Sequence, residues 1–190
     1  MSSDLKNAPS VTLVGTETFE EIFMRYYPLV YRLAYRCTGQ QDEADDIAQE
    51  VFLRYYRMPP RATSEGEQRS WLCRVATNLS LNALRAKQRR TSHEEQVSVQ
   101  LWQSETDLST QHDPEQHLLV AEQAGFVRTV LADMPERQQS YLLLRSIGLS
   151  YAEIAQTTGV ALASVGALLA RAEREFRRKY HERVTATQAK

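Results

Sequence analysis

Glycine and proline are scarce in this sequence, which has 7 glycines and 6 prolines among its 190 residues. These two residue types make up about 12% of an average protein, roughly twice their share here. Such a low content of turn-forming residues argues against a sandwich or barrel of many short strands. It favours long helices, and we therefore predict an all-α fold.

Cysteine pairs and long apolar runs are also missing. Cys37 and Cys73 stand alone without a Cys-x-x-Cys pair, which excludes a disulfide framework and a four-ligand zinc site and suits a reducing, cytoplasmic location. The sequence has no run of about 18 apolar residues, so we expect no membrane insertion. Its N-terminus has no apolar core of the signal-peptide type, which argues against export.

The usual signs of catalysis are missing as well. The histidines show no metal-ligand spacing, and there is no Ser/His/Asp set and no glycine-rich phosphate loop. We therefore expect no metal, no cofactor and no enzymatic activity.

Positive charge is missing from one stretch and concentrated in two others. Residues 91–127 carry 7 acidic side chains and no Lys or Arg, whereas residues 69–90 carry 6 basic side chains and no acidic one. Residues 128–190 carry 10 basic and 6 acidic side chains, although the whole chain has a net charge of only −1. Two basic stretches of this kind are typical of proteins that bind phosphate groups, but each could also be a solvated helix face.

Apolar residues in the first half of the chain recur at helical spacing. They predict helices over residues 18–38, 41–57 and 69–90, with a kink at Pro28 and a loop over Met58–Gln68. The second helix has the clearest apolar stripe: Ala44, Ile47, Ala48, Val51, Phe52 and Tyr55. Three helices that share apolar stripes can bury one core.

We therefore predict two small helical domains joined by a flexible acidic linker. The first domain covers residues 17–90 and follows a polar tail, residues 1–16. Residues 91–114 have no helical period and are rich in Ser, Thr and Gln, so they are predicted to be the linker. The second domain covers residues 115–183, and residues 184–190 form a short tail.

The second domain contains the spacing of a helix–turn–helix. Ser150-Tyr-Ala-Glu153 is a capping box, and the short helix that it opens ends at Gly159, where such a turn needs a left-handed residue. A longer helix with a basic end follows from about Ala161 to Tyr180, and Asp133 with Glu136 predicts the capped start of a helix upstream. The pattern is typical of DNA-binding proteins, although a structural helical hairpin would share it.

The third predicted helix carries a polar stripe. Its members lie three or four residues apart and share one face: Arg74, Asn78, Asn82, Arg85 and Arg89. Arginines can hold phosphates and asparagines can read base edges, but the stripe could equally be a solvated face opposite the core.

Four motifs in a fixed order resemble a known family. They are Asp46-Ile-Ala-Gln49-Glu50-Val-Phe52, Trp71-Leu-Cys-Arg74-Val-Ala-Thr-Asn78-Leu, Leu131-Ala-Asp-Met-Pro135-Glu-Arg137-Gln and Gly148-Leu-Ser-Tyr-Ala-Glu153-Ile-Ala155. Together they resemble the bacterial RNA polymerase sigma factors of the extracytoplasmic-function (ECF) group. The resemblance covers roughly residues 17–90 and 115–180.

The resemblance implies that the first domain binds core polymerase and opens the −10 promoter element. The family's core-binding helix matches Asp42–Arg57, and the polar residues that carry over are Asp46, Gln49 and Glu50. The family's −10 reader matches the loop Met58–Gln68, which would take a flipped base, and the helix after it. The residues implied in −10 binding are Asn78, Asn82, Arg85, Arg89 and Arg90.

The resemblance also implies that the second domain reads the −35 element as duplex DNA. Where the family's recognition helix commonly opens with Ser followed by Gly-Thr-Val-Lys-Ser-Arg, this chain has Ala161-Leu-Ala-Ser-Val-Gly-Ala-Leu168, without the two cations. We therefore expect weak electrostatic binding that depends on Ser164, Leu168, Arg171 and Arg174, or else a protein partner on this face. The acidic stretch 91–127 would follow the path of nucleic acid through the polymerase, or serve only as a linker.

These implications define the predicted function. A sigma factor directs core polymerase to specific promoters by melting the −10 element and binding the −35 element in the cytoplasm. Its partners would be RNA polymerase core, promoter DNA and, as in many members of the group, an anti-sigma factor. The alternative is a helix–turn–helix regulator that acts without polymerase, but this would leave Asp46, Gln49 and Glu50 unexplained.

Overall fold

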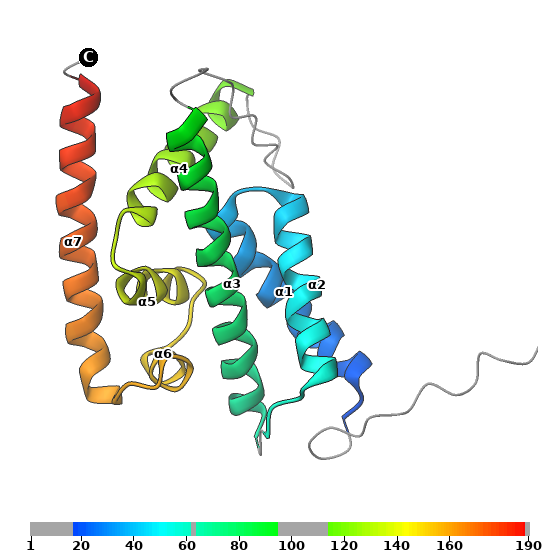
Figure 1. Ribbon diagram of the computed structural model, residues 1–190. Helices are drawn as coiled ribbons and strands as arrows, with labels where there is room; N and C mark the ends of the chain where they lie inside the picture. Colours follow the sequence, from blue (N-terminus) through cyan, green and yellow to red (C-terminus); the bar gives the residue numbers. More distant parts are fainter. Residues whose placement is uncertain (1–16, 62–63, 95–113, 189–190) are drawn as a thin grey trace, which may run out of the picture.

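The computed structural model describes residues 17–61, 64–94 and 114–188, which Figure 1 shows as a set of helices. All the regular elements in these ranges are helices, as predicted: α1 Phe19–Thr38, α2 Gln41–Arg57, α3 Glu65–Glu94, α4 Pro114–Ala132, α5 Glu136–Ser146, α6 Tyr151–Thr158 and α7 Leu162–Gln188. We call α1–α3 the N-terminal unit and α4–α7 the C-terminal unit. The predicted tail 1–16 and most of the predicted linker, residues 95–113, lie outside the described residues.

Helix α1 has a defined signal at each end. The Thr18 hydroxyl accepts a hydrogen bond from the Glu21 N–H, and the Glu21 carboxylate accepts one from the Thr18 N–H, which makes a capping box. Gly39 ends the helix with a left-handed φ of 73° and donates its N–H to the Tyr35 carbonyl. Pro28 lies inside α1, and the helix continues through it to Thr38.

The core of the N-terminal unit is formed by the inward faces of its three helices. The buried residues of α2 are the six of the predicted stripe, and they meet fully buried side chains from the neighbouring helices, among them Ile22, Val30, Leu33 and Leu72. Burying an aliphatic side chain of this size stabilises a fold by about 1.5–3 kcal/mol. Trp71 packs edge-on against the buried Tyr55, with ring centroids 5.6 Å apart, and so braces α3 against α2.

Helix α3 begins earlier than predicted, at Glu65 instead of Arg69, and it ends at Glu94. The Ser64 hydroxyl accepts a hydrogen bond from the Glu67 N–H and so satisfies a donor of the first turn. The loop predicted over Met58–Gln68 is therefore shorter, because residues 65–68 belong to the helix.

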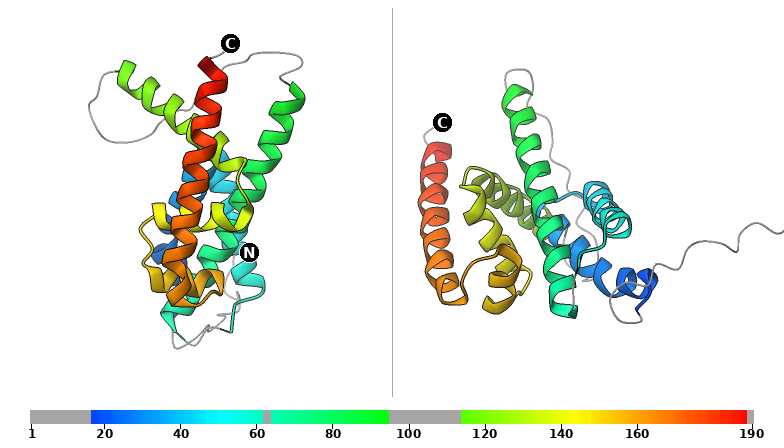
Figure 2. Two further views of the ribbon diagram at one scale, coloured as in Figure 1. Left: turned by 90° about the vertical axis from the view of Figure 1, so that its left-hand side faces the viewer. Right: turned by 60° about the horizontal axis from the view of Figure 1, so that its bottom comes forward.

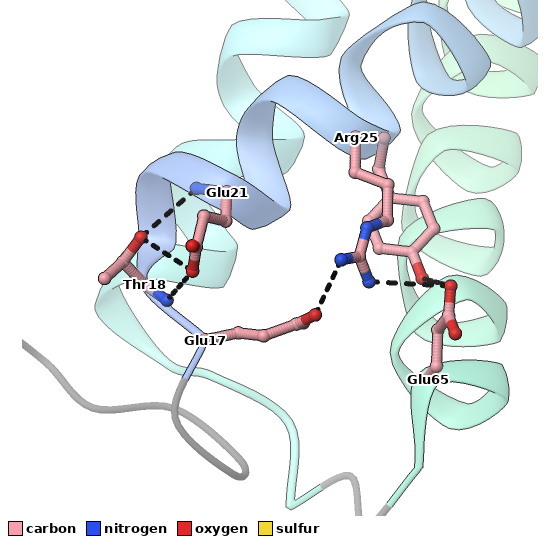
Figure 3. A network of polar contacts seen from close by, with 6 residues as sticks. Glu17, Thr18, Glu21, Arg25 and Glu65 are labelled. Carbon is pink, nitrogen blue, oxygen red and sulfur yellow. Dashed lines mark hydrogen bonds and ion pairs between the residues drawn. The ribbon is translucent and has the colours of Figure 1, made fainter.

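Charged contacts fix the start of α3 to α1 (Figure 3). Arg25 of α1 pairs with Glu17 at 2.7 Å and with Glu65 at 3.5 Å. The Tyr26 hydroxyl donates a hydrogen bond to Glu65 at 3.3 Å. These contacts hold one end of the loop that precedes α3.

The C-terminal unit contains the predicted helix–turn–helix. Ser150 and Glu153 form the capping box that opens α6, and Gly159 ends α6 with a left-handed φ of 72°. Val165 and Leu169 of α7 are buried, and they anchor α7 on the rest of the unit. Helix α7 is longer than predicted and continues past Tyr180 to Gln188.

A buried glutamine joins α4 to α5. The Gln139 side chain is fully buried, and its amide nitrogen donates to the carbonyls of Leu131 and Met134 at 2.8 and 2.9 Å, which satisfies acceptors at the end of α4. The expectation that Asp133 caps α5 is wrong, because Pro135 is the N-cap and no side chain caps this helix. Asp133 instead contacts Gln88 of α3 and Arg183 of α7.

Helix α3 lies at the centre of the molecule. It packs against α1 and α2 and also against α4, α5 and α6, so the two units are in direct contact. Figures 1 and 2 show α3 between the two groups of helices and α7 on the far side of the C-terminal unit. The fold therefore places the predicted −10 helix against the helix–turn–helix unit.

Candidate polymerase and nucleic-acid interfaces

The outer face of α2 carries the three predicted core-binding residues. Asp46 and Gln49 are exposed, and Glu50 is half-buried beside Arg54, with which it pairs at 2.6 Å. The three lie on one side of α2 because its apolar stripe faces the core. A polar patch presented in this way can dock on a basic partner without disturbing the fold.

Two apolar residues extend the outer face of α2, and the sequence analysis missed both. Leu53 and Tyr56 are 42% and 41% exposed, and their spacing from Asp46 and Gln49 places them on the same side of the helix. Protein interfaces are enriched in aromatic residues at the centre of the contact. The spacing alone could have identified them, since they fall outside the apolar stripe that was drawn for this helix.

A neighbouring carboxylate of α2 is used by the fold instead. The Tyr27 hydroxyl of α1 donates a hydrogen bond of 2.5 Å to Asp45. This bond, together with burial, raises the pKa of Tyr27 to about 12. Asp45 thus holds α1 to α2, whereas Asp46 beside it points outward.

The five predicted −10 residues all lie on α3, but they do not form one surface. Asn78, Asn82 and Arg89 are exposed and share a stripe. Arg90 is also exposed, but it is turned by about 100° from Arg89 around the helix axis. Arg85 is half-buried, because the C-terminal unit covers it.

Arg85 makes its contacts with α5. Its guanidinium donates a hydrogen bond to the Gln139 side-chain oxygen at 3.1 Å and pairs with Glu136 at 3.2 Å. Arg74, on the same polar stripe, donates to backbone carbonyls of α6. Two arginines that could hold phosphate are therefore engaged by the chain's own C-terminal unit.

The helix–turn–helix presents α7 as its second helix. Ser164, Arg171 and Arg174 are exposed, whereas Leu168 is half-buried and packs against the core. Leu162, which is 57% exposed, offers more apolar surface than Leu168. The exposed side of the first turns also carries Ala163 and Ala167, so no side chain there is charged.

An aromatic and cationic pair lies beside the start of α7. The Arg145 guanidinium lies 5.7 Å from the centre of the Tyr151 ring, and Tyr151 is 46% exposed. A Cβ added at Gly166 would lie 3.6 Å from this ring. Arg145 thus supplies positive charge near the start of α7, which the motif analysis overlooked because the residue belongs to α5.

Both cysteines are free and buried. Burial raises the pKa of the Cys37 thiol to about 12 and that of the Cys73 thiol to about 11, so both are weak nucleophiles at neutral pH. Within residues 17–61, 64–94 and 114–188, no group of three or more His, Cys, Asp or Glu side chains is placed to hold a metal ion.

Across the same ranges, no single helix is long and apolar enough to cross a membrane. One bent pair, Tyr151–Thr158 with Leu162–Ala186, meets the length and composition test with a bend of 93°. These are the two helices of the helix–turn–helix, and each contributes buried residues to the C-terminal unit, such as Ile154 of α6 and Leu169 of α7.

Comparisons with known proteins agree with this arrangement. The family model of sigma-70 region 2 matches residues 22–90, and the model of sigma-70 region 4 matches residues 127–176. The chain therefore belongs to the sigma-70 family of RNA polymerase sigma factors, and the relatives described below place it in the ECF group. The alternative of a helix–turn–helix regulator without polymerase is not favoured, because region 2 is matched as well as region 4.

Relatives include proteins named as ECF sigma factors. The chain is 30% identical over 163 residues to SigE of Mycolicibacterium smegmatis, covering 84% of this chain and 60% of the relative. It thus spans less than two thirds of that protein. It is 27% identical to the sigma-H factor of Pseudomonas aeruginosa, covering 81% of each, and 25% identical to SigW of Bacillus subtilis, covering 87% and 90%.

A solved structure shares the fold. It is the sigma factor RpoE of Bartonella quintana in complex with the anti-sigma factor NepR, which matches with a TM-score of 0.53 at 15% identity. The match covers 85% of this chain and 95% of that chain.

Proposed function

We propose that this chain binds core RNA polymerase through the outer face of α2 and directs it to specific promoters. The observation that carries the proposal is the pair of family matches, which fall on two helical units, together with the outward position of the predicted core-binding residues on α2. Asp46, Gln49 and Glu50 would make the polar contacts, and Leu53 and Tyr56 would add apolar surface beside them.

The promoter contacts are divided between the two units. The exposed residues Asn78, Asn82, Arg89 and Arg90 of α3, together with Arg85 once it is released, would hold the −10 strand. The loop before α3 would take an unpaired base. In the C-terminal unit, Ser164, Arg171 and Arg174 would contact the −35 duplex, and we assign the apolar contact to Leu162 in addition to Leu168.

The proposed cellular location and the further partner follow from the role as a sigma factor. The chain would act in the cytoplasm as an initiation factor without enzymatic activity of its own. The co-crystallised anti-sigma factor of the Bartonella quintana protein supports an anti-sigma factor as a further partner here.

Run-off transcription with core polymerase on genomic promoter fragments tests this function, and a charge reversal tests its contact face. Changing Asp46→Lys and Glu50→Lys should abolish co-purification with core and run-off activity, because it reverses the charge of the patch. Helicity should be kept, since both positions lie outside the buried stripe. The control for co-purification is Glu173→Lys with Glu182→Lys, which makes the same charge change on α7, away from the proposed core-binding face. Wild-type binding by the Asp46/Glu50 variant would overturn the assignment.

A further inference from the structure

One face of α3 is turned toward the C-terminal unit, which contacts it along its length but leaves Arg74 exposed. Its residues follow one another at intervals of three or four and so share one side of the helix: Ser70, Arg74, Thr77, Leu81, Arg85 and Gln88. We call this the docking face. Arg74, Arg85 and Gln88 bond to the C-terminal unit, and Thr77 and Leu81 between them are 3% and 0% exposed.

Arg74 makes the most specific of these contacts. Its Nε donates to the Thr157 carbonyl at 2.8 Å and its terminal nitrogen to the Gln156 carbonyl at 3.2 Å. Both carbonyls lie in the last turn of α6, where the helix itself supplies no donor. A forked guanidinium suits two neighbouring acceptors, so an arginine of one unit completes a helix end of the other.

Three further contacts surround this one. Arg69 pairs with Glu153 of α6, Arg85 contacts α5 through Glu136 and Gln139, and Gln88 contacts Asp133. Arg69, Arg74 and Arg85, three of the six basic residues in the stretch 69–90, are thus matched by carboxylates and carbonyls of the C-terminal unit.

The interface is nevertheless built from weak elements. The side chains of the Arg69–Glu153 and Arg85–Glu136 pairs are 28–58% exposed, and ion pairs of such exposure contribute little each. The buried hydroxyls of Thr77 and Thr157 have no hydrogen-bond partner within the described residues, which is unfavourable. A cavity of about 240 Å³ separates the units, between Ser70 and Cys73 on α3 and Leu149, Glu153 and Thr157 opposite.

The contact is also incompatible with binding both promoter elements. The −10 and −35 elements are about 25 base pairs apart by their names, or roughly 85 Å of duplex at about 3.4 Å per base pair. Leu162, the first residue of α7, is only five residues after Thr157, and five residues span at most about 18 Å. While Arg74 holds Thr157, α7 therefore stays close to α3.

We propose that the docking face of α3 binds α5 and α6 of the same chain in a closed state, and that promoter DNA competes with the C-terminal unit for Arg74 and Arg85. The proposal rests on the proposed function, because the competitor is the −10 strand. In the closed state the two arginines are held by the C-terminal unit. In the open state they are released to phosphate, and α7 can reach the −35 element.

Cys73 provides a direct readout of opening in the free full-length chain. It lines the cavity between the units and is 1% exposed, so a maleimide should label it slowly in the closed state. Peptide mapping by mass spectrometry distinguishes labelling of Cys73 from labelling of Cys37. Arg69→Glu places two carboxylates together and should accelerate Cys73 labelling at least tenfold, and Arg74→Ala should accelerate it several-fold.

Two further variants serve as controls for the rate of Cys73 labelling: one exchanges the charges of the Arg69–Glu153 pair, and one reverses a charge far from the interface. Arg69→Glu combined with Glu153→Arg should restore the slow rate, whereas Arg177→Glu on the outer side of α7 should leave it unchanged. The proposal is overturned if both Arg69→Glu and Arg74→Ala label at the wild-type rate, or if the exchanged pair stays fast. Circular dichroism shows whether each variant is folded. If Arg69→Glu proves to be unfolded, the labelling rate of Arg74→Ala alone tests the closed state.

Competition by DNA is tested from the side of the C-terminal unit, so that α3 is unchanged. Glu136→Gln with Glu153→Gln removes two carboxylate partners, and glutamine can still complete the capping box at Ser150. This variant should bind a fluorescent single-stranded oligonucleotide of mixed sequence roughly threefold to twentyfold more tightly than the control Glu20→Gln with Asp42→Asn, since each pair changes the equilibrium by a few-fold. The control removes the same charge at two exposed positions of α1 and α2, away from the docking face and from α7. Equal affinities would overturn the competition.

The outcomes separate this proposal from the proposed function. Neither measurement needs polymerase. A chain that supports run-off transcription but shows no effect of the docking-face variants lacks the closed state and keeps its function. Conversely, the variants could change the rate of Cys73 labelling without changing oligonucleotide binding. That result would refute the competition by DNA, and run-off transcription would still test the proposed function separately.

Discussion

The two units each present a long helix to nucleic acid in the proposed function, but they place their charge differently. On α3, arginines and asparagines recur along one side of the helix, although the C-terminal unit covers Arg85, and residues 69–90 contain no acidic side chain. On α7, the first two turns are uncharged, and the arginines that follow are partly paired with glutamates of the same helix: Arg177 with Glu173, and Arg178 with Glu175 and Glu182.

This difference indicates two modes of DNA contact. The stripe on α3 can hold phosphates of a single strand, and it must be uncovered before all of it is available. The start of α7 is already exposed but offers small and apolar side chains, so its contacts with the bases would depend on shape and apolar surface more than on charge. We therefore expect changes on α3 to have larger effects than changes on α7.

The largest expected effect concerns α3 in the holoenzyme. Replacing Asn78, Arg85 and Arg89 by Ala should reduce promoter opening at least tenfold and closed-complex formation much less, because hydrogen bonds to charged groups such as phosphates are worth about 1.5–3 kcal/mol each. Permanganate reactivity of −10 thymines measures opening. The matched control replaces the exposed Arg32 and Arg36 of α1 by Ala. Wild-type thymine reactivity in the α3 variant would show that this helix does not hold the open strand.

The sequence predicts each unit well where one helix or one turn decides the structure. Helix α2 has the predicted bounds because its apolar stripe is regular and Gln41 follows a glycine turn. The Ser150–Glu153 box and Gly159 are found as predicted because both are short-range signals. The sequence motifs also identify region 2 and region 4, because the motifs contain buried residues of the N-terminal and the C-terminal unit.

Long-range contacts account for the differences. Helix α7 continues past Tyr180 because its ring packs edge-on against Phe126 of α4, a contact that no local pattern reveals. The position of Arg74 depends on carbonyls about 80 residues away in the sequence. Helical periodicity places Arg74 on a polar stripe, but it does not indicate whether DNA or another part of the chain meets that stripe.

Two glycines allow the units to be compared directly. Gly39 and Gly159 both end a helix, with φ of 73° and 72°, so Ala at either position costs about 1–2 kcal/mol of backbone strain. A Cβ at Gly39 would also overlap the Arg128 guanidinium of α4, whereas nothing lies within 4 Å of one at Gly159. Because the guanidinium is the end of a flexible side chain and can shift, Gly39→Ala should lower the free energy of unfolding, measured in urea, only slightly more than Gly159→Ala.

The excess should disappear when the contact between the units is removed. In an Arg128→Ala background the two glycine variants should cost about the same, because only the backbone strain remains. An excess that persists in this background would mean that Arg128 does not occupy the space beside Gly39 in solution.

The uncharged start of α7 predicts a weak dependence of −35 binding on salt. Ala163→Lys with Ala167→Lys should tighten binding and steepen the slope of log K against log salt by up to about two units, one for each new phosphate contact. Arg171→Ala should reduce the slope by about one unit. The probe is a duplex from a promoter identified by run-off, titrated with the full chain.

The control for added charge places the lysines elsewhere on the C-terminal unit, at the exposed Ala152 and Ala186. These should leave the slope closer to that of the wild type. If neither the added lysines nor Arg171→Ala changes the slope, α7 does not face DNA, and a protein partner on this face becomes the better assignment.

The smallest expected effect comes from the two capping boxes, which have the same chemistry in different surroundings. Thr18→Ala and Ser150→Ala each remove a cap worth about 1 kcal/mol. Helix α1 has 20 residues and packs along both α2 and α3, whereas α6 has only 8. Loss of the cap should fray only the first turn of α1 but should loosen the whole of α6. Hydrogen exchange should thus accelerate about fivefold at Ile154 and Ala155 in the Ser150 variant and stay unchanged at Val30 and Leu33 in the Thr18 variant. Equal acceleration in the middle of both helices would mean that packing against the neighbouring helices protects α1 no better than α6.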